Sequence, residues 1–171
     1  PPPDFVLTSN VDGKFLDAGL DATRVYRPQG DWEFLQCVTP CSPKSYFASK
    51  PAVEKALAAM SPDGVVPPDA IPVCPKCGGP VFGNVRGGNW FLHTPYDEEH
   101  ARFVAWAEAL PTKGKVVVLE IGAGFNTPTV TRLPAESIAR EAGGTLVRVN
   151  PTEAGVPSEV SAVSLERGWD V

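Results

Sequence analysis

Four cysteines are the residues whose type and spacing point most directly to chemistry. Three residues separate Cys37 from Cys41, two separate Cys74 from Cys77, and 32 residues lie between the two pairs. Two disulfides are one interpretation, but such short pairs rarely close as structural disulfides, and two thiolates from each pair suit one tetrahedral zinc ion. Because sulfur would occupy all four positions, no position remains for water. The spacing therefore predicts a structural zinc site and not a catalytic one.

Three polar clusters form a second group of candidate residues. They contain Asn10 and Asp12 in the first cluster, Gly122, Gly124, Asn126 and Thr127 in the second, and Asn150 alone in the third. Glycines let backbone amides approach a phosphate or ribose closely, and asparagine offers donors and acceptors for ribose hydroxyls. Taken singly, the Gly-x-Gly segment and the Asn10–Asp12 segment are more often plain turns than ligand sites.

These residues need elements to position them, and the apolar pattern indicates where those elements lie. We expect strands at 5–8, 24–26, 115–121 and 145–149, and helices at 14–20, 51–60, 97–110 and 134–142. The continuous apolar run 115–121 is typical of a strand buried on both faces. Strand, helix and strand, with polar residues at the carboxyl ends of the strands, indicate half of a doubly wound α/β sheet.

The predicted fold is therefore α/β: the carboxyl-terminal part of a Rossmann-like doubly wound parallel sheet with a small inserted zinc-ribbon module. We assign 1–36 and 87–171 to the incomplete Rossmann-like part, and 37–86 to the zinc ribbon with its inserted helix and loop. The two histidines fall outside both predicted sites. We expect His93 to be a strand residue and His100 to lie in a helix, and neither to act as a base.

Composition excludes several classes of protein. The 171 residues are 43% hydrophobic and 20% charged, which is typical of a globular chain and not of a disordered one. Fifteen Lys and Arg against 20 Asp and Glu give a net charge of −5, a poor basis for binding nucleic acid. No apolar run approaches the roughly 18 residues of a membrane span. We expect a cytoplasmic protein that contacts neither nucleic acid nor membrane.

The order of the motifs resembles the sirtuins, the NAD-dependent deacylases and ADP-ribosyltransferases. The segment VLTSNVDGKFLDAG looks like their Asn-x-Asp segment, CVTPC and CPKC match their zinc tetrad, and LVRVNP looks like their adenosine-ribose strand. The resemblance covers the chain from Phe5 to about Pro157. It implies that NAD and zinc are the cofactors.

One departure from typical sirtuins concerns their catalytic histidine, since that position holds Gln29 in the run RPQGDWEFLQC. Glutamine has no titratable group near neutral pH, so it can position a ribose but cannot take its proton. The macrodomain-linked class M sirtuins, which are protein ADP-ribosyltransferases, resemble the chain here. FGNVRGGNWF is similar to their Asn-Leu-Arg segment, and LEIGAGFNTPTV to their Leu-Glu-Leu-Gly-x-Gly-x-Asn-Thr-Pro segment.

The resemblance implies the role of each site residue. Asn10 and Asp12 would orient the nicotinamide and its ribose, Gln29 would contact the ribose, and Arg86 would meet the acceptor. Gly122, Gly124, Asn126 and Thr127 would line the ribose and phosphate side, and Asn150 the adenosine ribose. Class M relatives are associated with lipoyl-carrier proteins, which makes such a protein the implied acceptor.

Two other functions remain open: an NAD-dependent lysine deacylase, and an inactive zinc-ribbon and half-Rossmann interaction module. A second departure is that the Gly-Ala-Gly-x-Ser loop, which cradles the NAD phosphates in sirtuins, does not precede Pro1. We therefore expect the 171-residue chain alone to bind NAD poorly and to be inactive.

Overall fold

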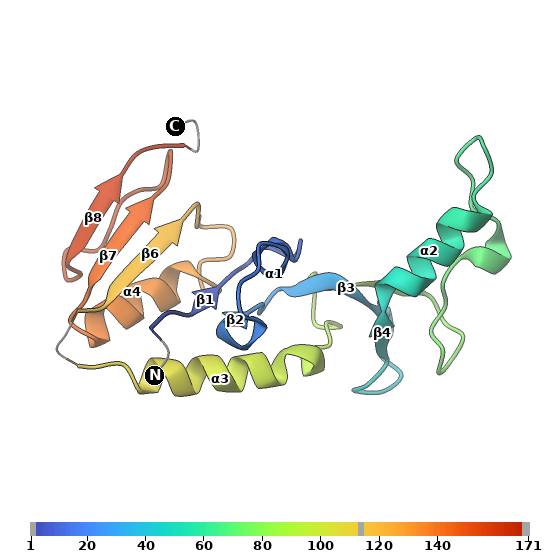
Figure 1. The fold of residues 1–171 in the computed structure, drawn as a ribbon, viewed down its shortest axis with the longest axis horizontal. Helices are drawn as coiled ribbons and strands as arrows, with labels where there is room; N and C mark the ends of the chain where they lie inside the picture. Colours follow the sequence, from blue (N-terminus) through green and yellow to red (C-terminus); the bar gives the residue numbers. More distant parts are fainter. Residues whose placement is uncertain (1–2, 113–114, 169–171) are drawn as a thin grey trace. The chain divides into compact units, whose positions relative to one another are not determined.

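A computed structural model describes residues 3–112 and 115–168, and Figure 1 labels their helices and strands. The chain divides into two compact units. Unit 1 contains residues 1–8 and 101–171, and unit 2 contains residues 9–100. The predicted zinc ribbon at 37–86 falls inside unit 2, and its boundaries stay a prediction.

Unit 2 is built on a three-stranded antiparallel sheet of order β4-β3-β5. Its strands are β3 (Gly30–Cys37), β4 (Tyr46–Ala48) and β5 (Val81–Val85). The register places Gln36 opposite both Tyr46 and Phe82, and shifts between Asp31 and Leu35. Around this sheet lie the helices α1 (Lys14–Asp17) and α2 (Ser49–Ala59), the strand β2 (Val25–Tyr26), and 3-10 turns at Ala22–Arg24, Pro68–Ala70 and Thr94–Tyr96.

Unit 1 is built on a three-stranded parallel sheet of order β6-β7-β8, which confirms the predicted α/β class. The strands are β6 (Val117–Ile121), β7 (Thr145–Val149) and β8 (Ala162–Leu165), and helix α4 (Arg132–Glu141) packs against the sheet. The core between them contains Ala135, Ala139, Leu146 and Val160. A right-handed crossover through a helix is the usual way to join parallel strands, and α4 fills that place between β6 and β7.

Unit 1 also contains an aromatic cluster. The ring of Phe5, next to strand β1 (Val6–Leu7), lies 5.5 Å from Phe103 and 5.4 Å from Trp106 between centroids. Both partners come from helix α3 (Asp97–Glu108), which begins in unit 2 and ends in unit 1. Helix α3 therefore packs against the segment before β1 through aromatic side chains.

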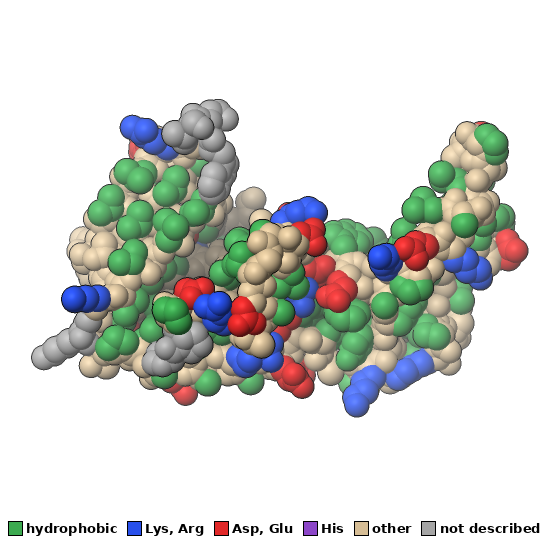
Figure 2. Space-filling view, in the orientation of Figure 1, with side chains coloured by type: hydrophobic (Ala, Val, Ile, Leu, Met, Phe, Trp, Pro, Cys, Tyr) green, Lys and Arg blue, Asp and Glu red, His purple; other side chains and the backbone are tan. Residues whose placement is uncertain are grey.

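The expectation that strand 115–121 is buried on both faces is wrong for this chain. In β6 the side chains alternate: Val117, Leu119 and Ile121 are 67%, 60% and 42% exposed, whereas Glu120 is buried. Figure 2 shows hydrophobic side chains spread over the open face of this sheet. The reason is that α4 covers only one face, and an apolar run fixes the strand but not what covers each side.

The helices in the described ranges are short, and α3, with 12 residues, is the longest of them. None of the helices in the described ranges combines the length and the apolar character that crossing a bilayer requires.

Candidate functional site

The four cysteines lie together in unit 2. Their sulfur atoms are all within 4.8 Å of one another, with 3.6 Å from Cys37 to Cys77 and 3.8 Å from Cys41 to Cys74. Sulfurs bound tetrahedrally at roughly 2.3 Å from one zinc ion are separated by about 3.8 Å. The donor set and its spacing therefore fit one tetrahedral metal ion with no open position.

Two tight turns bring the cysteines to this arrangement. In the second pair, the amide of Cys74 donates to the Gly79 carbonyl and the amide of Gly78 donates to the Cys74 carbonyl, each at 2.8 Å. Gly78 has a φ of 71°, the left-handed region that glycine favours. The backbone N–H groups of Lys76 and Cys77 lower the pKa of the Cys74 thiol to about 7, which favours the thiolate that a metal requires.

Gln29 lies in a turn that a buried ion-pair network holds in place. The amide of Gly30 donates to the Arg27 carbonyl at 3.0 Å and closes the turn. On one side Arg27 donates to Glu99 from its backbone amide at 3.0 Å and from Nη2 at 2.6 Å, and on the other its Nη1 donates to Asp31 at 2.9 Å. Burial lowers the pKa of Arg27, but the bonds and charges of Glu99 and Asp31 more than offset this, so it stays charged.

The side-chain oxygen of Gln29 is the atom of this turn that indicates a binding site. Oε1 is buried and has no hydrogen-bond partner among the described residues. A buried acceptor left without a donor costs roughly 1–3 kcal/mol, so such an atom marks a place where a ligand or water donates.

Arg86 lies directly beside Gln29. Its backbone amide donates to the Gln29 carbonyl at 2.9 Å, and its Nε donates to the Pro28 carbonyl at 3.2 Å. The guanidinium carbon lies 4.5 Å from the centre of the Phe91 ring. The structure thus brings together two of the predicted site residues that are 57 positions apart in the chain.

Two buried amides hold the segment 86–93 that carries Arg86. Gln36 donates to the Trp90 carbonyl and accepts from the Leu92 amide, both at 2.9 Å. Asn84 donates to Gln36 at 2.6 Å and to the Leu92 carbonyl at 2.9 Å. The prediction of a strand at His93 is wrong, because His93 lies directly before the 3-10 turn Thr94–Tyr96. His100 lies in a helix, as expected.

Asn10 and Asp12 are exposed residues of unit 2, ahead of helix α1. The Asp12 carboxylate accepts from the Lys14 amide at 3.1 Å, which stabilises the start of that helix. The carbonyl of Val11, between them, accepts from the Trp32 amide at 3.1 Å, so the segment is tied to β3 just beyond the Gln29 turn.

The remaining predicted residues lie in unit 1, at the carboxyl ends of β6 and β7. Gly122 has a φ of 68°, and Asn126 and Thr127 are exposed. Asn150 is buried: its Oδ1 accepts from the Thr152 amide at 3.1 Å and its Nδ2 donates to the Ala123 carbonyl at 3.1 Å. Asn150 therefore ties its own loop to the glycine turn, as well as being a candidate for ribose contact.

A buried charge cluster that was not predicted from the sequence contacts these two loops. Arg148, fully buried in β7, pairs with Glu120 of β6 through Nη2 at 2.8 Å and with Glu136 of α4 at 2.7 Å. Arg132 of α4 donates to the carbonyls of Ala123 and Glu153, both at 3.0 Å. In the sequence, Glu120 and Arg148 each stand inside an apolar strand run. A buried charge needs a partner of opposite charge, so this pattern indicates that the two residues pair.

The Glu153 carboxylate lies against the glycine turn, where it accepts from the Phe125 amide at 3.1 Å. A Cβ on Gly124 would lie 2.6 Å from the same carboxylate, so a larger residue at this position would displace the Glu153 side chain from the turn. The predicted cofactor-binding residues of unit 1 therefore belong to one preorganised pair of loops. The catalytic candidates Asn10, Asp12, Gln29 and Arg86 belong to unit 2.

Two curated proteins resemble the chain in sequence. No protein-family model matches the chain. It is 38% identical over 161 residues to a probable bifunctional ADP-ribose hydrolase/ADP-ribosyltransferase of Fusarium oxysporum, covering 91% of this chain and 27% of that protein. It is 30% identical over 138 residues to a protein ADP-ribosyltransferase of Staphylococcus aureus, covering 80% of this chain and 43% of that protein. The chain thus spans less than half the length of either relative.

Solved sirtuin structures share the fold. One, from work on the structural basis for sirtuin substrate affinity, has a TM-score of 0.61 at 18% identity and covers 96% of this chain and 59% of its own. A complex described as Sir2 with a p53 peptide and NAD+ has a TM-score of 0.59 at 19% identity, over 96% of this chain and 57% of its own. The chain therefore has the fold of part of a sirtuin.

Proposed function

We propose that this chain is part of an NAD-dependent protein ADP-ribosyltransferase of the sirtuin family, similar to the macrodomain-linked class M type. The observation that carries the proposal is Gln29, at the position where typical sirtuins have a catalytic histidine. Its Oε1 is buried beside Arg86 and has no hydrogen-bond partner within residues 3–112 and 115–168. The identity to two ADP-ribosyltransferases supports the same reaction.

The residues present suit NAD as the donor. In NAD, a glycosidic bond joins the ADP-ribosyl group to nicotinamide, and nicotinamide is the leaving group when this bond breaks. In the part of the chain that the structure describes, the buried Oε1 of Gln29 is an acceptor without a donor, and a ribose hydroxyl would provide one. Asn10 and Asp12 would orient the nicotinamide end. Gly122, Gly124, Asn126, Thr127 and Asn150 would meet the ribose and phosphate side.

Gln29 decides between transfer and deacylation. Removal of a lysine acyl group in typical sirtuins needs a base for a ribose hydroxyl, and an amide side chain cannot take that proton. Transfer of ADP-ribose to a protein nucleophile does not need that base. Arg86, next to Gln29, would hold the acceptor.

A zinc ion in the cysteine cluster would be structural. Cys37, Cys41, Cys74 and Cys77 would supply four thiolates, which leave no position for water, and would fix the end of β3 to the two turns. Since β3 begins at the Gln29 turn, zinc would stabilise the frame of the site without taking part in the reaction.

The experiment compares the full-length wild-type protein with Gln29→Ala and Gln29→His. With labelled NAD, we expect wild type to release nicotinamide and label protein. Gln29→Ala should lower the rate about tenfold, since a transition-state hydrogen bond worth about 1.4 kcal/mol corresponds to a factor of about ten. Glu33→Gln, at an exposed neighbour of the turn, is the matched control and should leave the rate unchanged. Efficient removal of acetyl groups from lysine peptides by wild type would contradict the proposal. Gln29→His should gain that activity, because a titratable base returns.

A further inference from the structure

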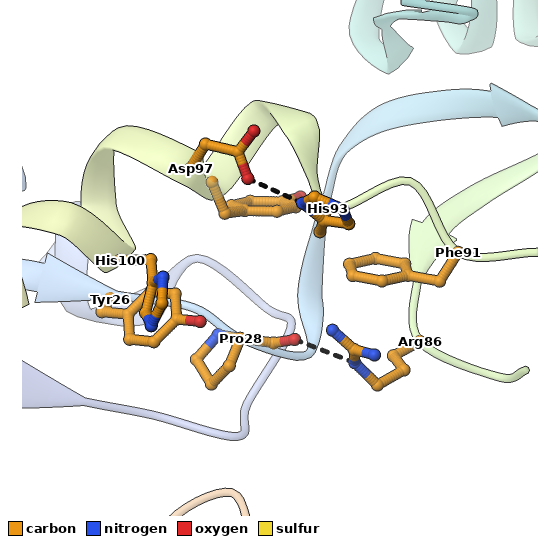
Figure 3. A pocket seen from close by; sticks show the side chains of 8 residues that line it. Tyr26, Pro28, Arg86, Phe91, His93, Asp97 and His100 are labelled. Atoms are coloured by element: carbon orange, nitrogen blue, oxygen red, sulfur yellow. Dashed lines mark hydrogen bonds and ion pairs between the residues drawn. The ribbon is translucent and has the colours of Figure 1, made fainter. Parts of the chain in front are cut away.

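Helix α2 takes no part in the candidate site. The pocket of about 300 Å3 beside the Gln29 turn, with Arg86 and His93 on its rim, belongs to that site, and its described lining includes no residue of α2 (Figure 3). Figure 1 shows α2 projecting from the antiparallel sheet of unit 2. The helix is therefore a separate surface of this unit.

One side of α2 carries an exposed apolar stripe. Val53, Leu57 and Met60 recur at i, i+4 and i+7, the spacing that places side chains on one face of a helix. They are 44%, 56% and 43% exposed, and no residue of α2 is buried. Helices shorter than about 12–15 residues are marginal in water, so the 11 residues of α2 depend on packing. The stripe is therefore a surface that a partner would stabilise by covering it.

The two ends of this stripe carry opposite charges. Lys50, in the first turn of α2, is 83% exposed, and 4.0 Å separates its Nζ from the Glu54 carboxylate. Asp63 is exposed in the turn after the helix, where the Gly64 amide donates to the Ser61 carbonyl. The Ser61 hydroxyl donates to the Asp63 carboxylate and lowers its pKa, so Asp63 is charged. A positive group thus precedes the stripe and a negative group follows it.

We propose that α2 binds α2 of a second copy of the chain, with the two helices antiparallel about a twofold axis. In this register Val53 lies opposite the partner's Met60, and Leu57 lies opposite the partner's Ala56. The two apolar stripes then cover each other. A twofold contact uses the same surface on both copies, so the surface must be complementary to itself.

The charges meet that requirement in the antiparallel arrangement. Lys50 and Asp63 lie six or seven positions on either side of the middle of the contact, so each Lys50 meets the partner's Asp63. Glu54 lies opposite the partner's Ala59, which leaves no like charges opposed. A parallel pair would place Lys50 against Lys50 and Glu54 against Glu54, and such repulsion suppresses the wrong arrangement.

Sedimentation velocity of the zinc-loaded full-length protein measures this dimer. Interfaces below about 1,200 Å2 belong to weak, transient complexes, so we expect a reversible monomer–dimer equilibrium with a Kd on the order of 10–100 μM. Low salt, about 0.05 M NaCl, keeps the exposed ion pairs from being screened. The sample contains no NAD and no acceptor, so the result goes beyond the proposed transferase function and does not depend on it.

Two matched variants of α2 test the stripe. Leu57→Glu places a charge in the middle of the contact and should raise the Kd at least about tenfold, because that charge would be buried without a partner. Ala58→Glu adds the same charge to α2 on the side away from the stripe, and it should leave the Kd within about twofold. Both positions are exposed, so circular dichroism and zinc content should match wild type.

A charge exchange tests whether the partner is a second copy. Lys50→Asp and Asp63→Lys should each raise the Kd several-fold, and the double variant should return it to within about twofold of wild type, because both pairs form again with reversed polarity. A protein that stays monomeric up to about 300 μM, a dimer that persists in Leu57→Glu, or a double variant no tighter than either single variant would each overturn the proposal.

Discussion

Replacing Glu99 by glutamine tests whether the buried ion pair with Arg27 holds the Gln29 turn. The two side chains are 10% and 11% exposed, and Glu99 accepts from the Arg27 backbone amide at 3.0 Å, from Nε at 3.2 Å and from Nη2 at 2.6 Å. Glutamine keeps the shape and one acceptor oxygen. It removes the charge and directs an NH2 group at donors of Arg27.

The magnitude follows from what remains paired. Loss of one hydrogen bond to a charged group costs about 1.5–3 kcal/mol, and removal of one partner of a buried pair about 3–5 kcal/mol when the other charge is left alone. Arg27 is not left alone, because Asp31, 6% exposed, still pairs with it at 2.9 Å. We therefore expect a loss of about 2–3 kcal/mol in the free energy of unfolding of unit 2.

Glu33→Gln is the matched control, since it removes a second carboxylate from the same guanidinium. Glu33 is 56% exposed and contacts Arg27 only at 3.3 Å, and exposed pairs are worth about 0–1 kcal/mol. Urea unfolding is followed by circular dichroism and by zinc release to a chelating dye, which reports on unit 2 because the cysteines lie there.

A loss below about 0.5 kcal/mol for Glu99→Gln, or equal losses for both variants, would refute this account of the turn. If the account holds, Glu99→Gln should also impair NAD cleavage in the full-length protein while Glu33→Gln does not, because only the buried partner holds the backbone amide of Arg27.

Two further predictions concern the metal and the turn. Cys74→Ser should lower bound zinc from about one equivalent to near none and destabilise the unit 2 sheet, as measured by atomic absorption and urea unfolding; a folded wild-type protein without metal would contradict this. Gly30→Ala should cost more than about 3 kcal/mol, since φ is 88° and the new Cβ would lie 2.0 Å from the Asn84 carbonyl oxygen. Gly19→Ala, at φ 86° with nothing within 4 Å, has the same backbone strain without the clash and should cost about 1–2 kcal/mol; equal losses would show that the close contact is irrelevant.

Local sequence determined the elements that depend on residues only a few positions apart in the chain. The two cysteine pairs lie on tight turns that each present two sulfurs, so their residue types and spacing were enough to predict one metal cluster. Apolar periodicity likewise predicted helices close to α2, α3 and α4 and strands close to β6 and β7. These features depend on neighbours a few positions apart, which a single sequence displays directly.

Strand β3 was not predicted, and the reason is physical. Its segment GDWEFLQC begins with two acids among apolar residues, and no simple alternation marks it as a strand. Asp31 is buried there because Arg27 neutralises it, and Arg27 is in turn held by Glu99, 72 positions away. Whether a charge can be buried depends on its partner, which local pattern does not reveal.

For the candidate site too, the sequence indicated some features and only the tertiary structure decided the others. The sequence, through a family resemblance, indicated Gln29 and Arg86 separately. Tertiary structure decided that Arg86 lies against Gln29, that His93 lies on a pocket rim and not in a strand, and that Asn150 ties two loops together. Residue types set which hydrogen bonds and ion pairs are possible, but only the packed chain selects which are formed, because each needs a partner from a distant segment at about 3 Å.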